Sequence, residues 1–356
     1  MLSILSDCVA HKNIALRAKF SDFWLIQEKH RRAMTNPQTH FPASLLHAFQ
    51  LDGEGSATSI DKLEEWEGSW FHFDISDDDI APWLTGVAGL NDIAASALTS
   101  VETRPRVLRR ANNLILTLRG LGSDSEQGSD DMISVRLWTD GARVISCRFK
   151  PLASTESVIE SLRAGAGAMT IPELIVNWVE CITDDMAGTI NNLEEQVDNI
   201  VDLIDTMDVA AARQSIIGLR QRAMLLRRYL SPQREALAKL SSENLSWLDE
   251  YSRVRLRDIT DRLIRYIEDL DQVRDRAILA HEELSARLAD DMNRKTYIFT
   301  IVAVIFLPLG FLTGLLGVNV GGVPGLEEPQ AFAWLILACL AISLGMLAFF
   351  RWRRWF

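Results

Sequence analysis

The chain has 356 residues and a formal net charge of −11, from 37 Lys and Arg against 48 Asp and Glu. This acidic balance argues against nucleic-acid binding, which requires a positively charged surface. The four cysteines, Cys8, Cys147, Cys181 and Cys339, show no CxxC spacing, so neither a disulfide framework nor a thiolate zinc site is indicated.

Residues 1–43 form an N-terminal extension. Within residues 1–33 the balance is basic, unlike the acidic body that follows, with six basic side chains (Lys12, Arg17, Lys19, Lys29, Arg31, Arg32) against three acidic ones (Asp7, Asp22, Glu28). Two interpretations stay open: a native basic extension, or a non-native segment with Met34 as the true start. The first thirty residues lack the apolar stretch of a signal peptide.

Residues 44–153 are predicted to form an α+β cytoplasmic domain. Short runs rich in β-branched and aromatic residues predict strands at 44–51, 69–75, 113–119, 132–139 and 142–149. Asp140-Gly141 joins the last two and favours a tight hairpin. Helices are expected at 77–85 and 91–98.

Three features of this region could suggest a ligand. The aspartates at 77–79 suit a helix N-terminus, and metal binding is the alternative. The acidic segment 123–131 lacks EF-hand spacing and is interpreted as a solvated hairpin loop. Gly165 and Gly167 have no preceding strand and no following Lys-Ser/Thr, so a phosphate loop is not predicted. No catalytic constellation is evident, and we do not expect an enzyme.

Residues 154–244 are predicted to form helical arms, with helices at 154–164, 171–207 and 210–241. One arm is acidic and the next is basic, which predicts two antiparallel helices of complementary charge. The acidic side chains are Glu194, Glu195, Asp198, Asp202, Asp205 and Asp208, and the basic ones are Arg213, Arg220, Arg222, Arg227, Arg228 and Arg234.

A long stalk helix is expected to follow. Residues 241–244 supply capping side chains, and apolar residues then recur at helical spacing from Leu245 to Met292. The cytoplasmic part spans 245–296, and helix continuing to Leu316 would measure about 108 Å at 1.5 Å per residue. A single helix of this length needs partners, which symmetric self-association would supply.

Two uncharged apolar runs close the sequence, at 297–316 and 331–350, each twenty residues long. Each is long enough to cross a bilayer as a helix, and a pair of buried core helices is the alternative. Basic residues precede the first run and follow the second, in the tail 351–356, whereas the connection has none. Both termini are therefore expected in the cytoplasm, with Trp334, Trp352 and Trp355 near the membrane interfaces.

The connection, residues 317–330, is expected to lie outside the membrane. It contains four glycines, two prolines and, as its only charges, Glu327 and Glu328, which would attract cations. It begins with Gly317-Val318-Asn319, where the Asn319 side chain offers a carbonyl oxygen. A tight loop at a pore entrance is the leading hypothesis, and an ordinary turn is the alternative.

The first apolar run continues the stripe of the stalk with seven residues at steps of four and three, of which all but Leu307 are small or hydroxyl-bearing. They are Thr296, Thr300, Ala303, Leu307, Gly310, Gly314 and Gly317. This face could line a pore or permit close helix packing in lipid. Pro308 is expected either to kink the helix or to free a backbone carbonyl. Because neither run contains a charge, a transported ion is expected to remain largely hydrated.

The sequence from Leu307-Pro308-Leu309 through Thr313-Gly314 to Gly317-Val318-Asn319, with its preceding helix and second span, resembles the CorA superfamily of divalent-cation transporters. The resemblance covers nearly the whole chain. It implies a funnel-shaped homopentamer with an αβα domain, stalk helices, two spans per subunit and an external selectivity filter. Val318 stands where the family has methionine, which is similar to the zinc-transporting ZntB branch.

The resemblance also implies roles for individual residues. Asn319 would form the entrance ring of the filter, together with Gly317 and Val318. Pore-lining positions would be Asn293, Thr296, Phe299, Thr300, Ala303, Leu307, Gly310, Thr313 and Gly314. The magnesium branch has a hydroxyl where this chain has Gly310, and Thr313 is a candidate replacement. Cytoplasmic metal positions would fall near Asp258 and Glu282, with His281 as a further candidate that is more simply explained by packing.

The resulting expectation is an inner-membrane homopentamer that transports Zn²⁺, with Cd²⁺, Ni²⁺ and Co²⁺ as further candidate ions, and with no bound cofactor. Proton coupling follows only from the resemblance. A CorA-type Mg²⁺/Co²⁺ channel is the alternative within the class. A membrane-anchored coiled-coil scaffold that conducts nothing is the alternative from another class, and it would not need Asn319.

Overall fold

The computed structural model describes residues 41–62, 66–76, 80–101, 104–123, 132–204, 206–318 and 329–353. The chain divides into two compact units, Met1–Ile278 and Leu279–Phe356. Most of the N-terminal extension, the aspartates at 77–79, most of the acidic segment 123–131, and Asn319, Glu327 and Glu328 lie outside the described residues.

In the first unit, the described residues form a seven-stranded mixed sheet with strand order β2-β1-β3-β7-β6-β5-β4. The strands are β1 (Leu45–Leu51), β2 (Ala57–Ser59), β3 (Ser69–Asp74), β4 (Arg106–Arg110), β5 (Asn113–Leu121), β6 (Met132–Thr139) and β7 (Val144–Arg148). β3 and β7 pair in parallel, and the other neighbours are antiparallel. The five predicted strands are confirmed, whereas β2 and β4 were not predicted.

The hairpin between β6 and β7 turns at the predicted Asp140-Gly141. Gly141 has a φ of +91°, which favours glycine, and a Cβ at this position would lie 2.1 Å from Cγ of Trp247. Trp247 belongs to the connection before the last long helix of the unit. Glycine at this position therefore permits both the turn and its close packing.

One face of the sheet is covered by α2 (Ala81–Gly86) and α3 (Asp92–Thr99). Phe71 and Phe73 of β3 pack against Trp83, with ring centroids 6.1 and 5.0 Å away. The Asn91 side chain caps α3 by accepting from the Ala94 amide at 2.9 Å. α2 begins at Ala81, later than the predicted residue 77, with Pro82 in its first turn.

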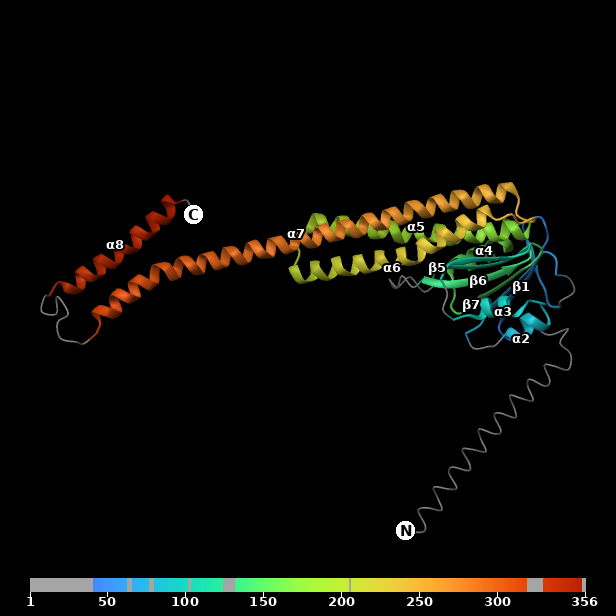
Figure 1. Cartoon of the computed structure of the whole chain (residues 1–356), viewed down its shortest axis with the longest axis horizontal. Coiled ribbons are helices and arrows are strands. Elements are labelled where there is room, and N and C mark those ends of the chain that lie inside the picture. The colour runs from blue at the N-terminus through green and yellow to red at the C-terminus, as the bar shows by residue number, and fades with distance from the viewer. Residues whose placement is uncertain are drawn as a thin grey trace, which may run out of the picture. The chain divides into compact units, whose positions relative to one another are not determined.

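The opposite face is covered by α4 (Ala153–Arg163) and the first part of α5 (Ile171–Leu203), so the domain is an α/β sandwich (Figure 1). Trp178 of α5 is buried against Trp70 of β3, with ring centroids 5.1 Å apart. His72 lies beside them and is fully buried. Its Nδ1 is 2.8 Å from the Ser146 hydroxyl of β7.

The arms form long helices, as predicted, but their ion pairs differ from the expectation. α5 is followed by α6 (Val209–Ser242) and α7 (Glu250–Leu316). Among the described residues, the ion pairs from the acids of α5 reach arginines of α7, as in Asp184–Arg262 at 2.5 Å. Arg227 of α6 pairs with Asp271 of α7 at 2.8 Å. α7 therefore carries the complementary charges for both arms.

The predicted start of the stalk helix at Leu245 is wrong by five residues. The capping side chains at 241–244 follow the end of α6, and α7 starts at Glu250. Asp249 caps α7 by accepting from the Ser252 amide at 2.8 Å. Leu245 is buried and Arg253 donates to its carbonyl at 3.1 Å. These contacts hold residues 243–249 as a packed connection instead of a helical turn.

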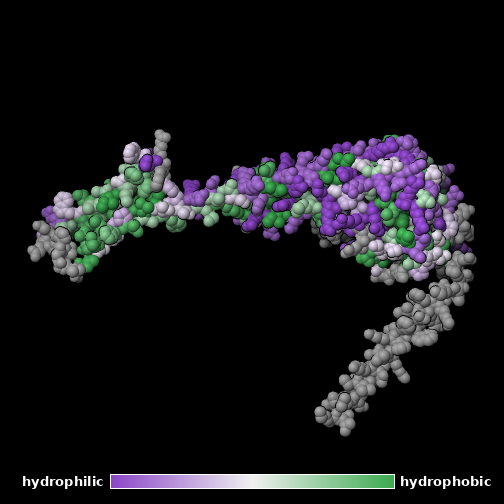
Figure 2. All heavy atoms as spheres, viewed as in Figure 1, coloured by the Kyte–Doolittle hydropathy of each residue, from purple (hydrophilic) through white to green (hydrophobic). Residues whose placement is uncertain are grey.

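The second unit contains the end of α7 and α8 (Ala331–Trp352). Both helices are long and apolar enough to cross a membrane, with a mean hydropathy of 2.4 in their most apolar windows. Hardly any of these windows is buried, and Figure 2 shows hydrophobic residues over both helices. Exposed apolar surface of this extent requires lipid or partner chains.

Candidate functional site

The candidate site is one face of α7 in the second unit. The predicted pore-lining residues all belong to this continuous helix. The stripe from Thr296 to Gly314 recurs at steps of four and three and lies along one side, and Phe299 and Thr313 each precede a residue of the stripe by one position. Phe299 and Leu307 are 75% and 77% exposed. Within a single chain this face is therefore open.

Two threonines on this helix donate their hydroxyl hydrogens to the backbone. Thr300 Oγ1 donates to the Thr296 carbonyl at 2.8 Å, and Thr313 Oγ1 donates to the Leu309 carbonyl at 2.8 Å. A hydroxyl that donates in this way keeps its lone pairs as acceptors. Both side chains are exposed. The helix therefore presents hydrogen-bond acceptors in an otherwise apolar segment.

The glycines of the face differ in the space around them. A Cβ added at Gly310 or Gly314 would meet no described atom within 4 Å. At Gly317 it would lie 3.0 Å from the Thr313 carbonyl oxygen, a crowded contact with backbone. Gly310 and Gly314 thus leave room beside the helix for another chain or for a hydrated ion, whereas Gly317 relieves crowding at the helix end.

Pro308 lies inside α7, as the sequence indicated, and the helix continues on both sides of it. Proline has no backbone N–H, so the Val304 carbonyl lacks its usual helical donor. Val304 was not among the predicted site residues. It could have been found from the sequence, because a proline removes the helical donor for the carbonyl four positions before it.

The structure describes only part of the predicted selectivity filter. The Gly317 amide donates to the Thr313 carbonyl at 2.9 Å, which closes the last turn of the helix, and Val318 is 50% exposed. Asn319, Glu327 and Glu328 remain predictions, because they lie outside the described residues.

The cytoplasmic metal candidates are not brought together. Among the described residues, no group of three or more His, Cys, Asp and Glu side chains is placed to hold a metal ion. Asp258 and Glu282 are exposed on α7 and separated by 24 positions in sequence. His281 is partly buried, and its Nδ1 has no hydrogen-bond partner among the described residues. Asn293 is exposed near the start of the apolar segment.

Comparison with known proteins identifies the family of the chain. The family model described as "CorA-like Mg2+ transporter protein" matches residues 67–354. The zinc transport protein ZntB of Yersinia enterocolitica is 33% identical over 315 residues, covering 87% of this chain and 95% of that protein. The divalent cation transporter CmaX of Pseudomonas aeruginosa is 36% identical over 318 residues, covering 86% and 94%.

Solved structures give the same result for the fold. The full-length CmaX structure matches with a TM-score of 0.76 and 31% identity, covering 89% of this chain and 99% of that one. The CorA magnesium transporter of Methanocaldococcus jannaschii has a TM-score of 0.75 at 17% identity, covering 86% and 98%, and supports the fold alone.

The α/β domain, the long helix and the apolar helices thus define a membrane transporter and not an enzyme. The chain belongs to the CorA family of divalent cation transporters.

Proposed function

We propose that this protein is a homopentamer of the cytoplasmic membrane that carries hydrated Zn²⁺ through a central pore lined by α7. The observation that carries the proposal is that the exposed apolar segment of α7 offers hydrogen-bond acceptors, namely the hydroxyls of Thr300 and Thr313 and the carbonyl of Val304. A hydrated cation presents water hydrogens on its outside, and these require acceptors.

The chemistry of the helix favours a hydrated ion over a directly bound one. Zn²⁺ held directly by protein prefers His nitrogen and Cys sulfur. Residues 296–318 contain no His, Cys, Asp or Glu. An ion that kept its water would interact with the available hydroxyls and carbonyls without being trapped, as conduction requires.

The pore requires several copies of the chain. One helix face cannot enclose a path, and the apolar parts of α7 and α8 are exposed in a single chain. Symmetric association around the α7 face would cover this surface and surround a central path. The number five comes from the resemblance to the CorA family.

The choice of Zn²⁺ rests on Val318 and on relatives named as zinc transporters. The membrane topology that fits the flanking charges has both termini in the cytoplasm and the loop 317–330 outside. In this topology the Asn319 carbonyls would form the outer ring, and Glu327 and Glu328 would concentrate cations near it. The Mg²⁺/Co²⁺ channel remains the alternative. Asp258, Glu282 and His281 are left out of the proposal.

The test is uptake of Zn²⁺ into proteoliposomes that contain the full-length protein. We expect uptake that excess Mg²⁺ reduces only weakly, and that Asn319→Ala diminishes. A proton gradient, imposed in either direction, tests coupling in the same assay. Mg²⁺ flux without Zn²⁺ flux would favour the magnesium alternative. If no divalent cation moves under any gradient, the transporter proposal is wrong, and the result favours the alternative of a scaffold that conducts nothing.

A further inference from the structure

A buried histidine lies in the contact between the sheet and α5. His72 of β3 is 0% exposed, and Trp178 of α5, which is 1% exposed, lies beside it with ring centroids 5.9 Å apart. Trp70 and His47 lie on other sides of the imidazole, with centroids 6.0 and 6.4 Å from its own. This contact uses no residue of the α7 face or of the external loop.

The hydrogen bonds of Ser146 assign the tautomer of His72. Ser146 Oγ accepts from Trp70 Nε1 at 2.8 Å and donates its single hydrogen to the Phe71 carbonyl at 3.2 Å. Its remaining lone pair is therefore left to accept from His72 Nδ1, which lies 2.8 Å away. With the ring hydrogen on Nδ1, a further proton would join His72 at Nε2.

The two polar atoms that α5 and β3 bring into this contact have no hydrogen-bond partner. Nε2 of His72 and Nε1 of Trp178 are both buried and unpaired among the described residues. A proton on Nε2 would place a charge and a hydrogen-bond donor where no acceptor lies. The closed contact therefore disfavours the protonated imidazole, whereas an open contact would let water solvate it.

The charged groups around the ring do not compensate for such a charge. Arg148 is 8% exposed and engages both carboxylates of this cluster, at 3.8 Å on β3 and 3.4 Å on α4. Burial lowers the pKa of His72 well below its ordinary value, and the charges of Arg148 and His47 lower it further. The side chain that α5 places against the ring is the neutral Trp178. The charged and titratable groups on the other packed elements are His47 of β1, Asp74 of β3, Arg148 of β7, and Glu156 and Arg163 of α4.

The same stretch of α5 also holds α7. Glu180 follows Trp178 by two positions, which places the two side chains on opposite sides of the helix. Arg262 of α7 donates to one carboxylate oxygen of Glu180 at 2.7 Å, and Arg255 donates to the other. A displacement of this stretch from the sheet therefore disturbs its ion pairs with α7.

We propose that His72 makes the contact between the sheet and α5 an acid-sensitive switch: when the pH falls, protonation at Nε2 opens this contact and weakens the hold of Glu180 on α7. The proton comes from the solvent, which reaches Nε2 only as Trp178 moves away, so opening and protonation are linked. Acidity thereby acts on the helix that continues into the apolar segment. This switch differs from proton coupling, because it moves no proton across a membrane.

The experiment is hydrogen–deuterium exchange with mass spectrometry on the full-length protein in detergent, between pH 5.5 and 7.5. Protection factors, which correct each rate for the intrinsic effect of pH, report local opening. Below the ordinary histidine pKa of about 6.5, an opening that takes up one proton becomes up to tenfold more frequent per pH unit. Because no transport is measured, the result does not depend on the proposed function.

We expect this loss of protection in peptides from the first part of α5, and a smaller loss in peptides of α7 that contain Arg255 and Arg262. The internal control is α3, which covers the opposite face of the sheet and should lose less protection than α5. This comparison within the wild-type protein tests the proposal even where a variant fails to fold.

Three variants test the residues. Asparagine does not titrate, so His72→Asn should remove the acid-dependent loss of protection from α5 and from α7. The matched control is His47→Asn, which makes the same change at a half-buried position of β1 and should retain most of the loss. Glu180→Gln separates the two steps, because it weakens the link to α7 and leaves the response of α5 to acid in place.

Three results would overturn the proposal. Constant protection of α5 between pH 7.5 and 5.5 would show that the closed contact accommodates a charged imidazole, for example against the Trp178 indole. An equal loss in α5 and α3 would indicate that the domain unfolds as one unit. An unchanged acid response in His72→Asn would assign the opening to other groups, such as Asp184 and Asp185 of α5, whose pKa values burial raises.

Discussion

Arg262 of α7 donates from Nη2 to Oε1 of Glu180 on α5 at 2.7 Å. The same arginine reaches Asp184 through Nη1 at 2.5 Å, and Arg255 donates to the other oxygen of Glu180. Both carboxylate oxygens of Glu180 are thus paired with arginines of α7. This arrangement fixes α7 against the helix that also covers the sheet.

We predict that Glu180→Gln lowers the free energy of unfolding by about 1–2 kcal/mol. The loss is smaller than for a fully buried ion pair, because solvent partly screens this site. Burial raises the pKa of Glu180, but hydrogen bonds from Arg255 and Arg262 outweigh it, and the net pKa is lowered. The stabilisation is therefore present above the ordinary pKa and is lost as the pH falls through the lowered one. Thermal unfolding of the full-length protein at pH 7 and at acidic pH measures both effects.

The matched control for this prediction is Glu250→Gln. Glu250 pairs with Arg257 at 3.4 Å, and its side chain is 73% exposed. Such a pair contributes little, so we expect a change below about 0.5 kcal/mol. An equal loss of stability in the two variants would contradict the prediction that the ion pairs of Glu180 with Arg255 and Arg262 stabilise the fold.

We predict that the protein loses stability below about pH 6.5 because of His72. Burial lowers the pKa of His72 well below its ordinary value, and the nearby charges of Arg148 and His47 add to the effect. As the pH falls, His72 becomes protonated in the unfolded state while it stays neutral in the folded state. The free energy of unfolding therefore falls with pH, by at most about 1.4 kcal/mol per pH unit.

His72→Asn should flatten the stability profile between pH 5 and 7, because asparagine does not titrate and retains a polar group toward Ser146. Chemical denaturation across this range is the measurement. His47→Asn provides the comparison, since burial lowers the pKa of His47 less strongly and the flattening should be smaller. An unchanged slope in His72→Asn would show that other groups cause the acid sensitivity.

The regular elements could largely be predicted from local patterns. β6 has the predicted bounds because Ile133, Val135, Trp138 and Thr139 favour a strand and the turn pair Asp140-Gly141 follows its last residue. β4 was missed because Arg106–Arg110 buries only Val107 and is otherwise polar, as an edge strand can be. The start of α7 was misplaced because the capping residues that were assigned to it belong to the connection after α6, where tertiary contacts of Leu245 and Arg253 decide the conformation.

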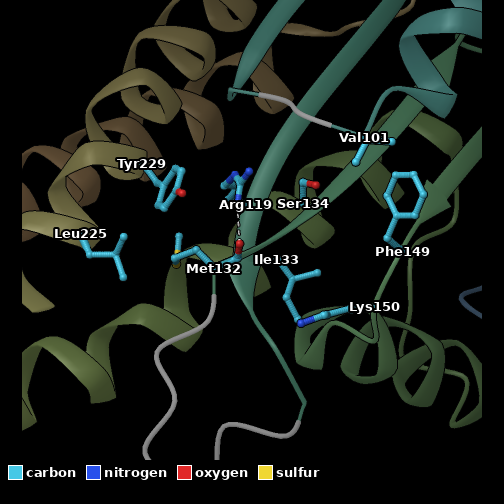
Figure 3. A pocket seen from close by; sticks show the side chains of 9 residues that line it. All are labelled: Val101, Arg119, Met132, Ile133, Ser134, Phe149, Lys150, Leu225 and Tyr229. Atoms are coloured by element: carbon cyan, nitrogen blue, oxygen red, sulfur yellow. Dashed lines mark hydrogen bonds between the residues drawn. The ribbon is translucent and has the colours of Figure 1, made fainter. Parts of the chain in front are cut away.

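The helix that carries the candidate site was predictable for a different reason. Helical spacing alone places Thr296 to Gly317 on one face, so no tertiary information was needed. The pocket between the sheet and α6 that Figure 3 shows could not be predicted, because its lining residues Arg119, Ser134, Lys150 and Tyr229 are brought together only by the fold. The proposed arrangement of several chains around the α7 face is likewise not encoded in any local pattern.

We predict that Thr313→Val reduces Zn²⁺ uptake into proteoliposomes by about fivefold, which corresponds to one hydrogen bond of about 1 kcal/mol. Valine keeps the shape of threonine and removes the acceptor that would face the hydrated ion. Ser343→Ala is the control, because Ser343 on α8 makes the same kind of bond, to the Cys339 carbonyl at 2.8 Å. A similar loss in both variants would indicate an effect on folding or insertion instead of on the pore.

We predict that Gly314→Leu reduces uptake roughly tenfold or more, because its side chain would extend from the α7 face into the proposed path. The substitution is tolerated by the single chain, since a Cβ at Gly314 meets no described atom within 4 Å. Gly345 on α8 has the same open surroundings, so Gly345→Leu is a matched control that should retain most of the uptake. Chemical crosslinking of both variants in membranes checks that they still assemble. Normal uptake by an assembled Gly314→Leu protein would place the path away from this face of α7.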